Sequence, residues 1–533
     1  MSFDYRNSNP VGIILVIVTI AGLLGALAMG SMVAHNDFTK LTAIFGLAAG
    51  IALLLFLGRN VWLLIPLCWP LTGKIQVLPI PLNVQELAIL AAFGFYIALL
   101  VFKKPLHRPR AGWMEFWMVL NLIWIASVFF RNPVGMRALG SDMLGGRPYF
   151  EILIAGCAFW VLTRTIIPSK QARFFPILMA AGSLLVSVIG TLTTFFPRLT
   201  PLVAPFYSGV DTTTYLQEEF KGGGSTSGTG RLTQLRSLGT ELPSVLYALF
   251  RPFTLLNPIK ILPFLLFFIG IAALFLSGFR SALIGTGAAF VLASYFWGGM
   301  QEAFRAVFLA IAAVVLLIAA QSAGIQLPLS AQRALSFLPG DWDQTAIQEA
   351  EGTTEWRIDM WKAVIDNPDK FLKNPFFGTG FGFSAEDLAI QMQAAFGGQG
   401  YIGGTQFEGQ LMTGAFHNGP LSTIRFVGIV GLLLYYPLII IMAVSSVRLV
   451  NRARGSPYFY LAVYLSVPSI YGIFSFTFIY GAFDGALQSA LFFCAMLRCT
   501  SESLQSWQEN QEGSSITAGN DIRQKFAALD EKA

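Results

Sequence analysis

The sequence predicts an all-α protein, a polytopic bundle of about 12–14 transmembrane helices with two long extracytoplasmic loops. Of the 533 residues, 55% are hydrophobic and 12% are charged, whereas soluble domains carry roughly 25% charged residues. The mean hydropathy is +0.62. Apolar stretches of about 20 residues, the length that a helix needs to cross a bilayer, recur along the chain. An ordinary water-soluble enzyme is therefore excluded.

The expected helices follow one another with short connections except at two places. The apolar run that begins after the first ten residues has no small-residue cleavage site, so we expect it to remain as an anchor. The segments 60–72 and 241–256 are short and contain proline or arginine, which also allows a re-entrant or broken helix. The expected helices span residues 11–33, 41–58, 60–72, 84–102, 112–130, 148–166, 174–196, 241–256, 260–277, 281–298, 304–324, 417–443, 457–479 and 485–499.

Clusters of basic residues between the helices predict the orientation. All of them fall on one side of the expected bundle, which the positive-inside rule assigns to the cytoplasm. Both termini are then cytoplasmic, and the loops 197–240 and 325–416 lie outside. The net charge of +6 consequently reflects orientation and does not indicate nucleic-acid binding. The clusters are Lys103, Lys104, Arg108 and Arg110, then Arg164, Lys170 and Arg173, and finally Arg448, Arg452 and Arg454.

These features divide the chain into six regions. From Ser501 onward the sequence is polar and mixed in charge, so we expect a disordered tail with a short helical end. The regions are N-terminal transmembrane helices at 1–200, a first long periplasmic loop at 201–240, central helices at 241–324, a large periplasmic loop at 325–416, C-terminal helices at 417–499 and a cytoplasmic tail at 500–533.

The large outer loop contains an amphipathic pattern. Trp356, Met360 and Val364 recur at roughly helical spacing, so residues 355–365 are expected to form a helix on the membrane surface or against the bundle. Arg357 then lies near an interface. The sequence NPFFGTGFG follows, with glycines at Gly378, Gly380 and Gly382 that allow tight turns and close approach of the backbone to a ligand.

Neither this turn nor a nearby acidic pair indicates a cofactor. The glycine spacing is not that of a dinucleotide-binding turn, and no strand–helix unit surrounds it. Asp341-Trp-Asp343 resembles a metal-binding DxD motif, but it lies in the outer loop, where nucleotide sugars are absent, and we interpret it as a solvated turn. The sequence predicts no metal site and no cofactor.

Rare basic residues lie where the outer loops meet the membrane. His417 and Asn418 stand at the start of a membrane helix, where a histidine is either a structural cap or a functional group. Arg280 lies at the outer end of another helix, and it either snorkels to lipid phosphates or faces a functional cavity. Arg231 and Arg236 follow a glycine-serine run that is more typical of a flexible linker than of a phosphate-binding loop.

Three of these pieces together resemble the O-antigen ligase and Wzy-type polysaccharide polymerase superfamily. They are SGFRSAL with Arg280, the stretch from Arg357 to NPFFGTGFG, and His417-Asn418 followed by Gly428 and Gly431. The resemblance covers roughly residues 230–445. The chain departs from the family at Phe426, where an acidic residue is common, and at Thr240-Glu241, where relatives commonly have Pro-Asn.

The resemblance implies a metal-independent, inverting glycosyltransferase of the bacterial inner membrane. Its donor would be a glycan on undecaprenyl diphosphate, and its acceptor a sugar hydroxyl of a glycan or glycolipid, as in lipopolysaccharide or exopolysaccharide biosynthesis. Arg280, Arg231 and Arg236 match the diphosphate, because guanidinium groups bind phosphate oxygens in bidentate geometry. His417 is the candidate general base, and Arg357 and Asn418 are candidate substrate-binding residues.

Other functions fit the composition as well. A transporter or flippase of lipid-linked glycans would also be polytopic, although no internal repeat of the kind common in transporters is apparent. A purely structural subunit would not need a histidine, arginines and a glycine-rich turn on one side. Within the enzyme interpretation, the sequence leaves open whether the glycan is ligated to a carrier, polymerised or attached to protein.

Overall fold

The computed structural model describes residues 38–76, 78, 82–135, 145–209, 230–382, 407, 410–411, 413–479 and 481–530. These residues form helices and irregular connections, with no β-strand among them beyond one isolated bridge between Lys74 and Asn83. The all-α prediction is confirmed. The expected first helix at 11–33 and most of the glycine-serine run before Arg231 lie outside the described residues.

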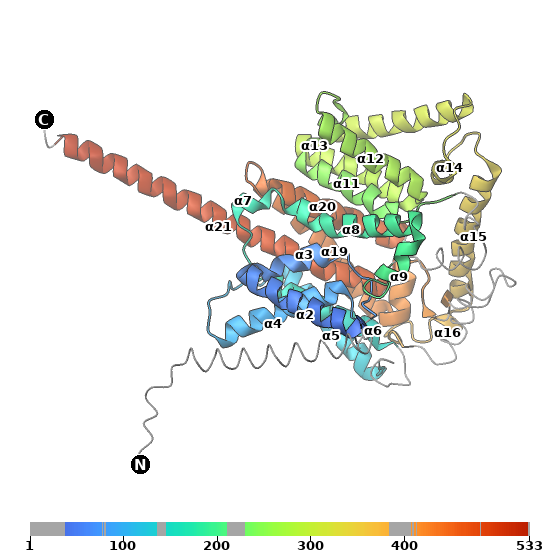
Figure 1. Ribbon diagram of the computed structural model, residues 1–533, viewed down its shortest axis with the longest axis horizontal. Coiled ribbons are helices and arrows are strands. Elements are labelled where there is room, and N and C mark those ends of the chain that lie inside the picture. The colour runs from blue at the N-terminus through green and yellow to red at the C-terminus, as the bar shows by residue number, and fades with distance from the viewer. Residues whose placement is uncertain are drawn as a thin grey trace, which may run out of the picture.

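The longer helices run in alternating directions through the bundle (Figure 1). Their bounds are α2 Phe38–Leu57, α3 Leu64–Cys68, α4 Val84–Val101, α5 Trp113–Arg131, α6 Gly146–Leu162, α7 Ser169–Ala172, α8 Phe175–Phe195, α9 Thr200–Val203, α11 Leu235–Leu249, α12 Ile261–Ser277, α13 Arg280–Ser322, α14 Leu329–Leu335, α15 Gln344–Asp366, α16 Pro368–Phe371, α19 Gly419–Ala453, α20 Phe459–Phe474 and α21 Phe483–Asp530.

Seven helical segments in the described part of the chain are long and apolar enough to cross a membrane, and α12 is a shorter apolar helix. The sides of these helices that face away from the bundle carry large apolar groups. Phe56, Phe130 and Phe308, for example, are 87%, 79% and 75% exposed. Such side chains are stable in lipid and unfavourable in water, so the chain is a multi-pass membrane protein. The seven segments are Ala48–Cys68, Val84–Val101, Trp113–Arg131, Phe175–Phe195, Arg280–Ser322, Gly419–Ala453 and Phe459–Ile479.

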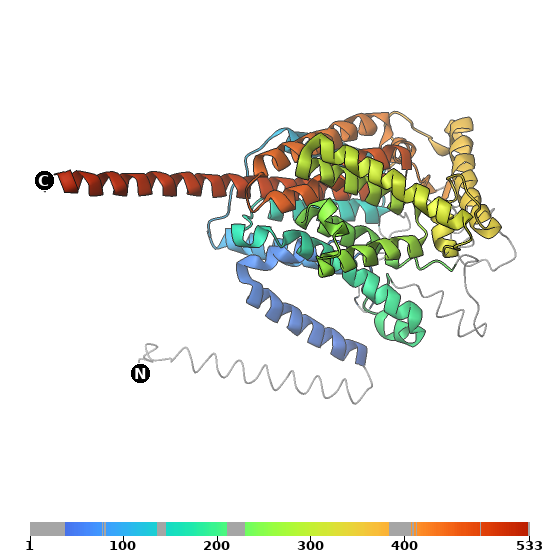
Figure 2. The same cartoon turned by 90° about the horizontal axis from the view of Figure 1, so that it is seen from above.

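The bundle has two distinct ends. At one, which we call the loop end, α14, α15 and α16 lie across the ends of the long helices (Figures 1 and 2). At the other, the tail end, α21 leaves the bundle and projects far beyond it. The connections 102–112 and 163–174 also lie at the tail end.

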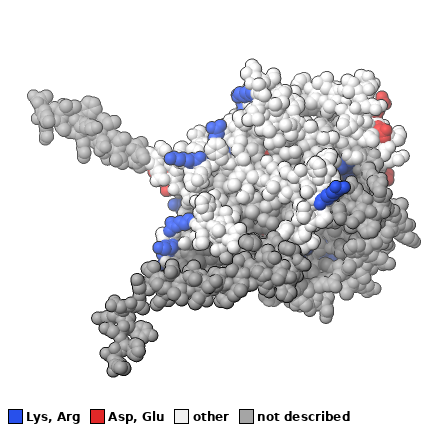
Figure 3. Space-filling view, viewed as in Figure 1, with Lys and Arg blue, Asp and Glu red and all other residues white. Residues whose placement is uncertain are grey.

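The basic clusters gather around α21 at the tail end. His107 Nε2 lies 3.5 Å from Glu502 Oε2, and Arg498 donates a hydrogen bond to Arg110 O. Arg173 and Arg454 line one cavity with Trp507 of α21. Figure 3 shows most of the lysine and arginine side chains on its face at this end, while aspartate and glutamate appear at the loop end. The clusters therefore lie at the end opposite the outer-loop helices.

One pair of expected helices forms a single, broken helix, and one expected short segment has different bounds. The expected helices 281–298 and 304–324 are both part of α13, which has a non-helical backbone at Gly299 (φ 75°, ψ −164°). The expected short segment 241–256 appears as α11, which begins at Leu235 inside the predicted first loop, followed by a 3₁₀ turn at Pro252–Leu256.

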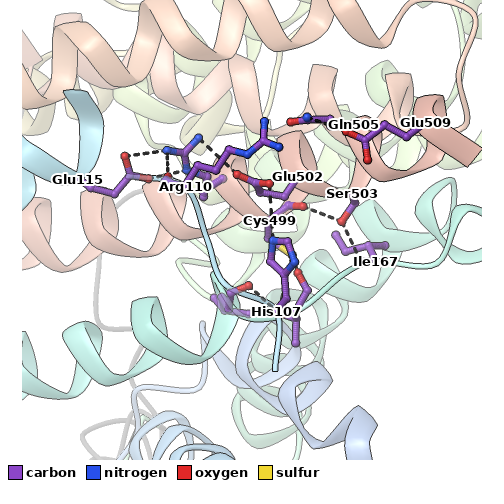
Figure 4. Close-up of polar contacts among 12 residues, drawn as sticks. His107, Arg110, Glu115, Ile167, Cys499, Glu502, Ser503, Gln505 and Glu509 are labelled. Carbon is purple, nitrogen blue, oxygen red and sulfur yellow. Dashed lines mark hydrogen bonds and ion pairs between the residues drawn. The ribbon is translucent and has the colours of Figure 1, made fainter. Parts of the chain in front are cut away.

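The prediction of a disordered tail from Ser501 is wrong, because α21 continues as helix to Asp530. Contacts at its exit from the bundle explain the difference. Leu504 is fully buried, and Ser503 Oγ accepts a hydrogen bond from Ile167 N at 2.8 Å (Figure 4). One turn further, Gln505 Nε2 donates to Glu509 Oε1 at 2.9 Å, a pairing that supports a helix.

Candidate active site

The loop end is organised around the C-terminus of α12. Gly278 there has a left-handed backbone (φ 67°), which ends the helix and leaves carbonyl oxygens to be satisfied. Arg333 of α14 donates from Nη1 to Gly278 O at 2.8 Å, and Arg231 donates from Nε to Ser277 O at 3.3 Å. Cations at a helix C-terminus also oppose the negative end of its dipole. Two arginines are thereby brought to one helix end.

Arg333 is a candidate site residue that the sequence reasoning missed. Its side chain is 7% exposed, and its Nε lies 3.4 Å from Glu349 Oε2 on α15. Burial and the neighbouring Arg357 lower the pKa of Arg333, while Glu349 raises it. Burial and Arg333 likewise lower the pKa of Arg231, to about 10. The sequence SAQRAL around Arg333 carries no motif, so only its position in the outer loop could have pointed to it.

Arg231 and Arg236 meet at one aromatic ring. The Arg231 guanidinium carbon lies 4.6 Å from the centroid of Phe279, and that of Arg236 lies 4.8 Å from it. Cation–π contacts of this kind hold a guanidinium in place while leaving its edge available for hydrogen bonds. The two loop arginines that the sequence predicted as diphosphate-binding residues therefore lie close together. The ring that they share belongs to the residue directly before Arg280.

Arg280 connects the start of α13 to α15. Its Nη2 group donates to Ala350 O at 2.5 Å, to Thr353 Oγ1 at 3.0 Å and to Thr354 Oγ1 at 3.1 Å. Within the described part of the chain, no acceptor binds its Nε or Nη1 groups, and no carboxylate pairs with it. Arg280 is thus anchored through one nitrogen, and its other donors are available for a ligand.

Arg357 on α15 links the arginines to the histidine. It lies near enough to Arg280, Arg333 and His417 for its charge to act on each of them. Burial, and secondarily this charge, lowers the pKa of His417 below its ordinary value. The imidazole is therefore neutral at physiological pH, the state in which histidine accepts a proton.

His417 is held in an unusual conformation. Its backbone φ is +52°, in the left-handed region, which is uncommon for residues other than glycine. The ring lies 5.4 Å from that of Trp356 between centroids, and Nε2 is 2.9 Å from Gln410 Oε1. Trp361 Nε1 donates to the preceding carbonyl, Phe416 O, at 2.9 Å. Strained residues held by several contacts are common at functional sites.

Asn418 caps α19. Its Oδ1 accepts from Leu421 N at 3.0 Å, and so it satisfies one of the free N–H groups of the first turn. The expected helix at 355–365 is found as part of the longer α15. Its buried residues Met360 and Val364 pack with Phe416, so this helix positions the start of α19.

The glycines of NPFFGTGFG allow close approach of the backbone to a ligand, but in the structure the turn lies against a helix. Within α19, Gly428 has a non-helical backbone (φ 77°, ψ 175°), and a Cβ there would lie 2.2 Å from Phe376 O. A Cβ at Gly378 would lie 2.4 Å from Phe426 O. The close approach requires glycine on both sides.

This contact satisfies the backbone of the broken helix. Gly380 N donates to Phe426 O at 2.8 Å, and Ile429 N donates to Pro375 O at 2.7 Å. Trp124 of α5 donates from Nε1 to Val427 O at 2.8 Å. Irregular backbone at membrane depth is tolerated only when its polar groups are paired in this way. The turn therefore fixes the break in α19 that follows His417.

A cavity of about 440 Å³ extends into the bundle from Arg236. It is lined by hydroxyl-bearing residues and by Glu241, which accepts a hydrogen bond from Tyr464 OH at 2.9 Å. Thr286 Oγ1, which also lines the cavity, is buried and has no hydrogen-bond partner among the residues that the structure describes. The cavity therefore holds a few polar groups within a largely apolar lining, next to Arg236. Glu241 belongs to one of the two places, with Phe426 the other, at which the sequence departs from the family pattern.

The DxD-like sequence has a local role. Asp343 Oδ1 accepts from Thr345 N at 2.8 Å and caps α15, and Gln321 Nε2 donates to the backbone carbonyl of Asp341 at 3.2 Å. Across the described ranges, no three histidine, cysteine, aspartate or glutamate side chains are placed to hold a metal ion.

Comparison with known families adds independent information on this region. Residues 265–436, about a third of the chain, match the model of a family described as O-antigen ligase. The predicted family resemblance is confirmed over this stretch. The O-antigen ligase-like stretch contains Arg280, Arg333, Arg357 and His417, whereas Arg231 and Arg236 precede it. A search of curated proteins finds no match.

Proposed function

We propose that the protein is a metal-independent, inverting glycosyltransferase that takes a glycan from undecaprenyl diphosphate and joins it to an acceptor sugar hydroxyl. The observation that carries the proposal is the position of Arg357, whose charge reaches both Arg280 and His417. It supports a single site in which a phosphate-binding group and a proton acceptor act on the same substrate.

The arginines would stabilise the leaving group. When the bond between the anomeric carbon and the phosphate oxygen breaks, its electron pair stays with the diphosphate, which gains negative charge. The free donors of Arg280 and the guanidinium groups of Arg231 and Arg236 fit this task. Arg333 positions this group through Gly278 O and the end of α12.

His417 would act on the acceptor. The acceptor oxygen attacks the anomeric carbon from the side opposite the diphosphate, which inverts the configuration, and its proton passes to the neutral imidazole. The lowered pKa of His417 favours the neutral form. Asn418 and Arg357 lie directly beside it, and we assign them to the acceptor side of the site.

The basic clusters support an orientation of the protein in the membrane. The basic clusters at the tail end favour a cytoplasmic tail end, by the positive-inside rule. In this arrangement the loop end faces the periplasm of a bacterium, the protein lies in the inner membrane, and both termini are cytoplasmic. A lipid-linked donor then reaches the arginines from the outer leaflet.

The test is transfer by the purified protein from a lipid-linked oligosaccharide to an added glycan or glycolipid acceptor, with the product resolved by mass spectrometry. We expect a new glycosidic bond and release of undecaprenyl diphosphate, at the same rate in EDTA. Loss of transfer in EDTA that magnesium restores would contradict the metal-independent mechanism. Movement of the donor across a vesicle membrane without bond formation would instead support a flippase.

A further inference from the structure

A second charged cavity, unrelated to the candidate active site, lies at the tail end. It has a volume of about 480 Å³ and is formed by the first turn of α5, the last turns of α19 and the part of α21 near Arg498. Arg448, Arg452 and Arg498 all line it. The cavity therefore joins three cationic side chains from two helices in one space.

The arginines differ in how they are balanced. Arg498 Nε donates to Glu115 Oε1 at 2.6 Å, so its charge is neutralised within the protein. Arg448 and Arg452 are exposed, and no carboxylate in the described part of the chain pairs with either of them. Because they are four residues apart on α19, both side chains lie on one face of the helix. This face presents two unneutralised charges to the cavity.

Apolar residues line the same cavity on the side toward the membrane interior. Along α19, Ile441 and Val444 precede Arg448 and Arg452, and Val444 is 44% exposed. Trp113, at the start of α5, is 72% exposed at the edge of the cavity. Tryptophan is typical of the membrane–water interface. The lining therefore changes from apolar to cationic in the direction that leads from the membrane core to its surface.

We propose that this cavity binds an anionic phospholipid of the leaflet at the tail end. Its phosphate would lie between Arg448 and Arg452, since guanidinium groups bind phosphate oxygens with paired hydrogen bonds. Its acyl chains would extend along Ile441 and Val444 into the hydrocarbon. Basic cavities between membrane helices are known sites for anionic headgroups. A soluble anion would make no use of the apolar side.

The test uses the whole purified protein in a neutral detergent, titrated with phosphatidylglycerol, with phosphatidylcholine and with inorganic phosphate. Bound lipid is counted by native mass spectrometry. We expect phosphatidylglycerol to bind more tightly than phosphatidylcholine. The double variant Arg448→Gln/Arg452→Gln should weaken phosphatidylglycerol binding by about tenfold or more, because each basic residue near anionic lipid contributes appreciably.

A matched control has the same change in charge elsewhere at the tail end. Lys103 and Lys104 are exposed and lie outside the cavity lining, so Lys103→Gln/Lys104→Gln should bind phosphatidylglycerol nearly as the unaltered protein does. If both double variants lost phosphatidylglycerol binding equally, the binding would depend only on the general surface charge, and the proposal would be overturned. Equal binding of phosphatidylcholine, or full competition by inorganic phosphate, would overturn the assigned occupant. Arg448→Lys/Arg452→Lys, which keeps the charge, should retain part of the binding.

Discussion

Two arginines at opposite ends of the bundle have different partners. Arg498, at the tail end, donates to both oxygens of Glu115, at 2.6 and 3.0 Å, and lies 3.7 Å from Glu502. Arg280, at the loop end, donates to one carbonyl and two hydroxyl oxygens and has no carboxylate partner in the described part of the chain. A neutralised arginine contributes to folding, whereas one bound only to neutral oxygens keeps its charge for a ligand.

The burial of the loop-end cations strengthens this contrast. Arg333 is nearly enclosed, and burial and like charges lower the pKa of both Arg333 and Arg231. Placing several cations near one another is unfavourable unless an anion joins them. Perturbed groups of this kind gather at functional sites. We infer that the site is completed by the diphosphate of the donor.

Apart from His417→Ala, the substitution expected to lower glycan transfer most is Arg333→Ala. Loss of the donor to Gly278 O and of the charge near Arg231 should lower single-turnover transfer by about 10²- to 10³-fold, the scale for one preorganised donor. Because the change also removes the Arg333–Glu349 ion pair, Arg333→Ala/Glu349→Ala is the control. The double variant should recover stability but not transfer. If the double variant recovered transfer fully, the role of Arg333 would be only to neutralise Glu349.

The second prediction concerns the tail end. Arg498→Ala leaves Glu115 partly buried and without its ion-pair partner, so the free energy of unfolding should fall by about 2–3 kcal/mol, somewhat less than for a fully buried pair. Denaturant titration in detergent measures this loss. Transfer per folded molecule should stay unchanged. A large drop in transfer by well-folded Arg498→Ala would break the contrast between the two ends.

The smallest expected effect is a shift in pH dependence. A general base must be neutral, and the pKa of His417 is lowered, so transfer should hold as the pH falls past the ordinary histidine value and decline only below it. Arg357→Gln removes the charge that contributes to this lowering. The pKa should then rise part of the way back, because burial remains the larger cause, and the decline should begin at higher pH. A decline that stays at the same pH, or that moves to lower pH, would contradict an action of the Arg357 charge on His417.

Sequence reasoning selected those candidate site residues whose type is rare at their position. Arg280 and His417 stand out because a charged or imidazole group at the mouth of an apolar helix needs an explanation. Arg333 has no such contrast, since it lies in a polar loop, and its partners Gly278 and Glu349 are distant from it in the sequence. Its role depends on how α14 packs against α12.

Other differences also arise from tertiary contacts. The glycines of NPFFGTGFG indicated close backbone approach, but the sequence does not say that the partner is the broken backbone of α19 at Gly428. The polar composition after Ser501 indicated disorder, yet Leu504 and Ser503 are buried against the bundle, and α21, which begins at Phe483 within the bundle, continues as a helix. The membrane helices themselves were predictable, because length and hydropathy determine them locally.

The most direct test of the account is His417→Ala, with donor binding and transfer measured separately on the purified protein. If His417 is the general base, donor affinity should remain nearly intact, while single-turnover transfer should fall by about 10²- to 10⁴-fold. Arg280→Ala, measured alongside, should weaken donor binding and transfer together. Near-normal transfer by well-folded His417→Ala would contradict the mechanism and leave His417 as a structural residue that fixes the start of α19.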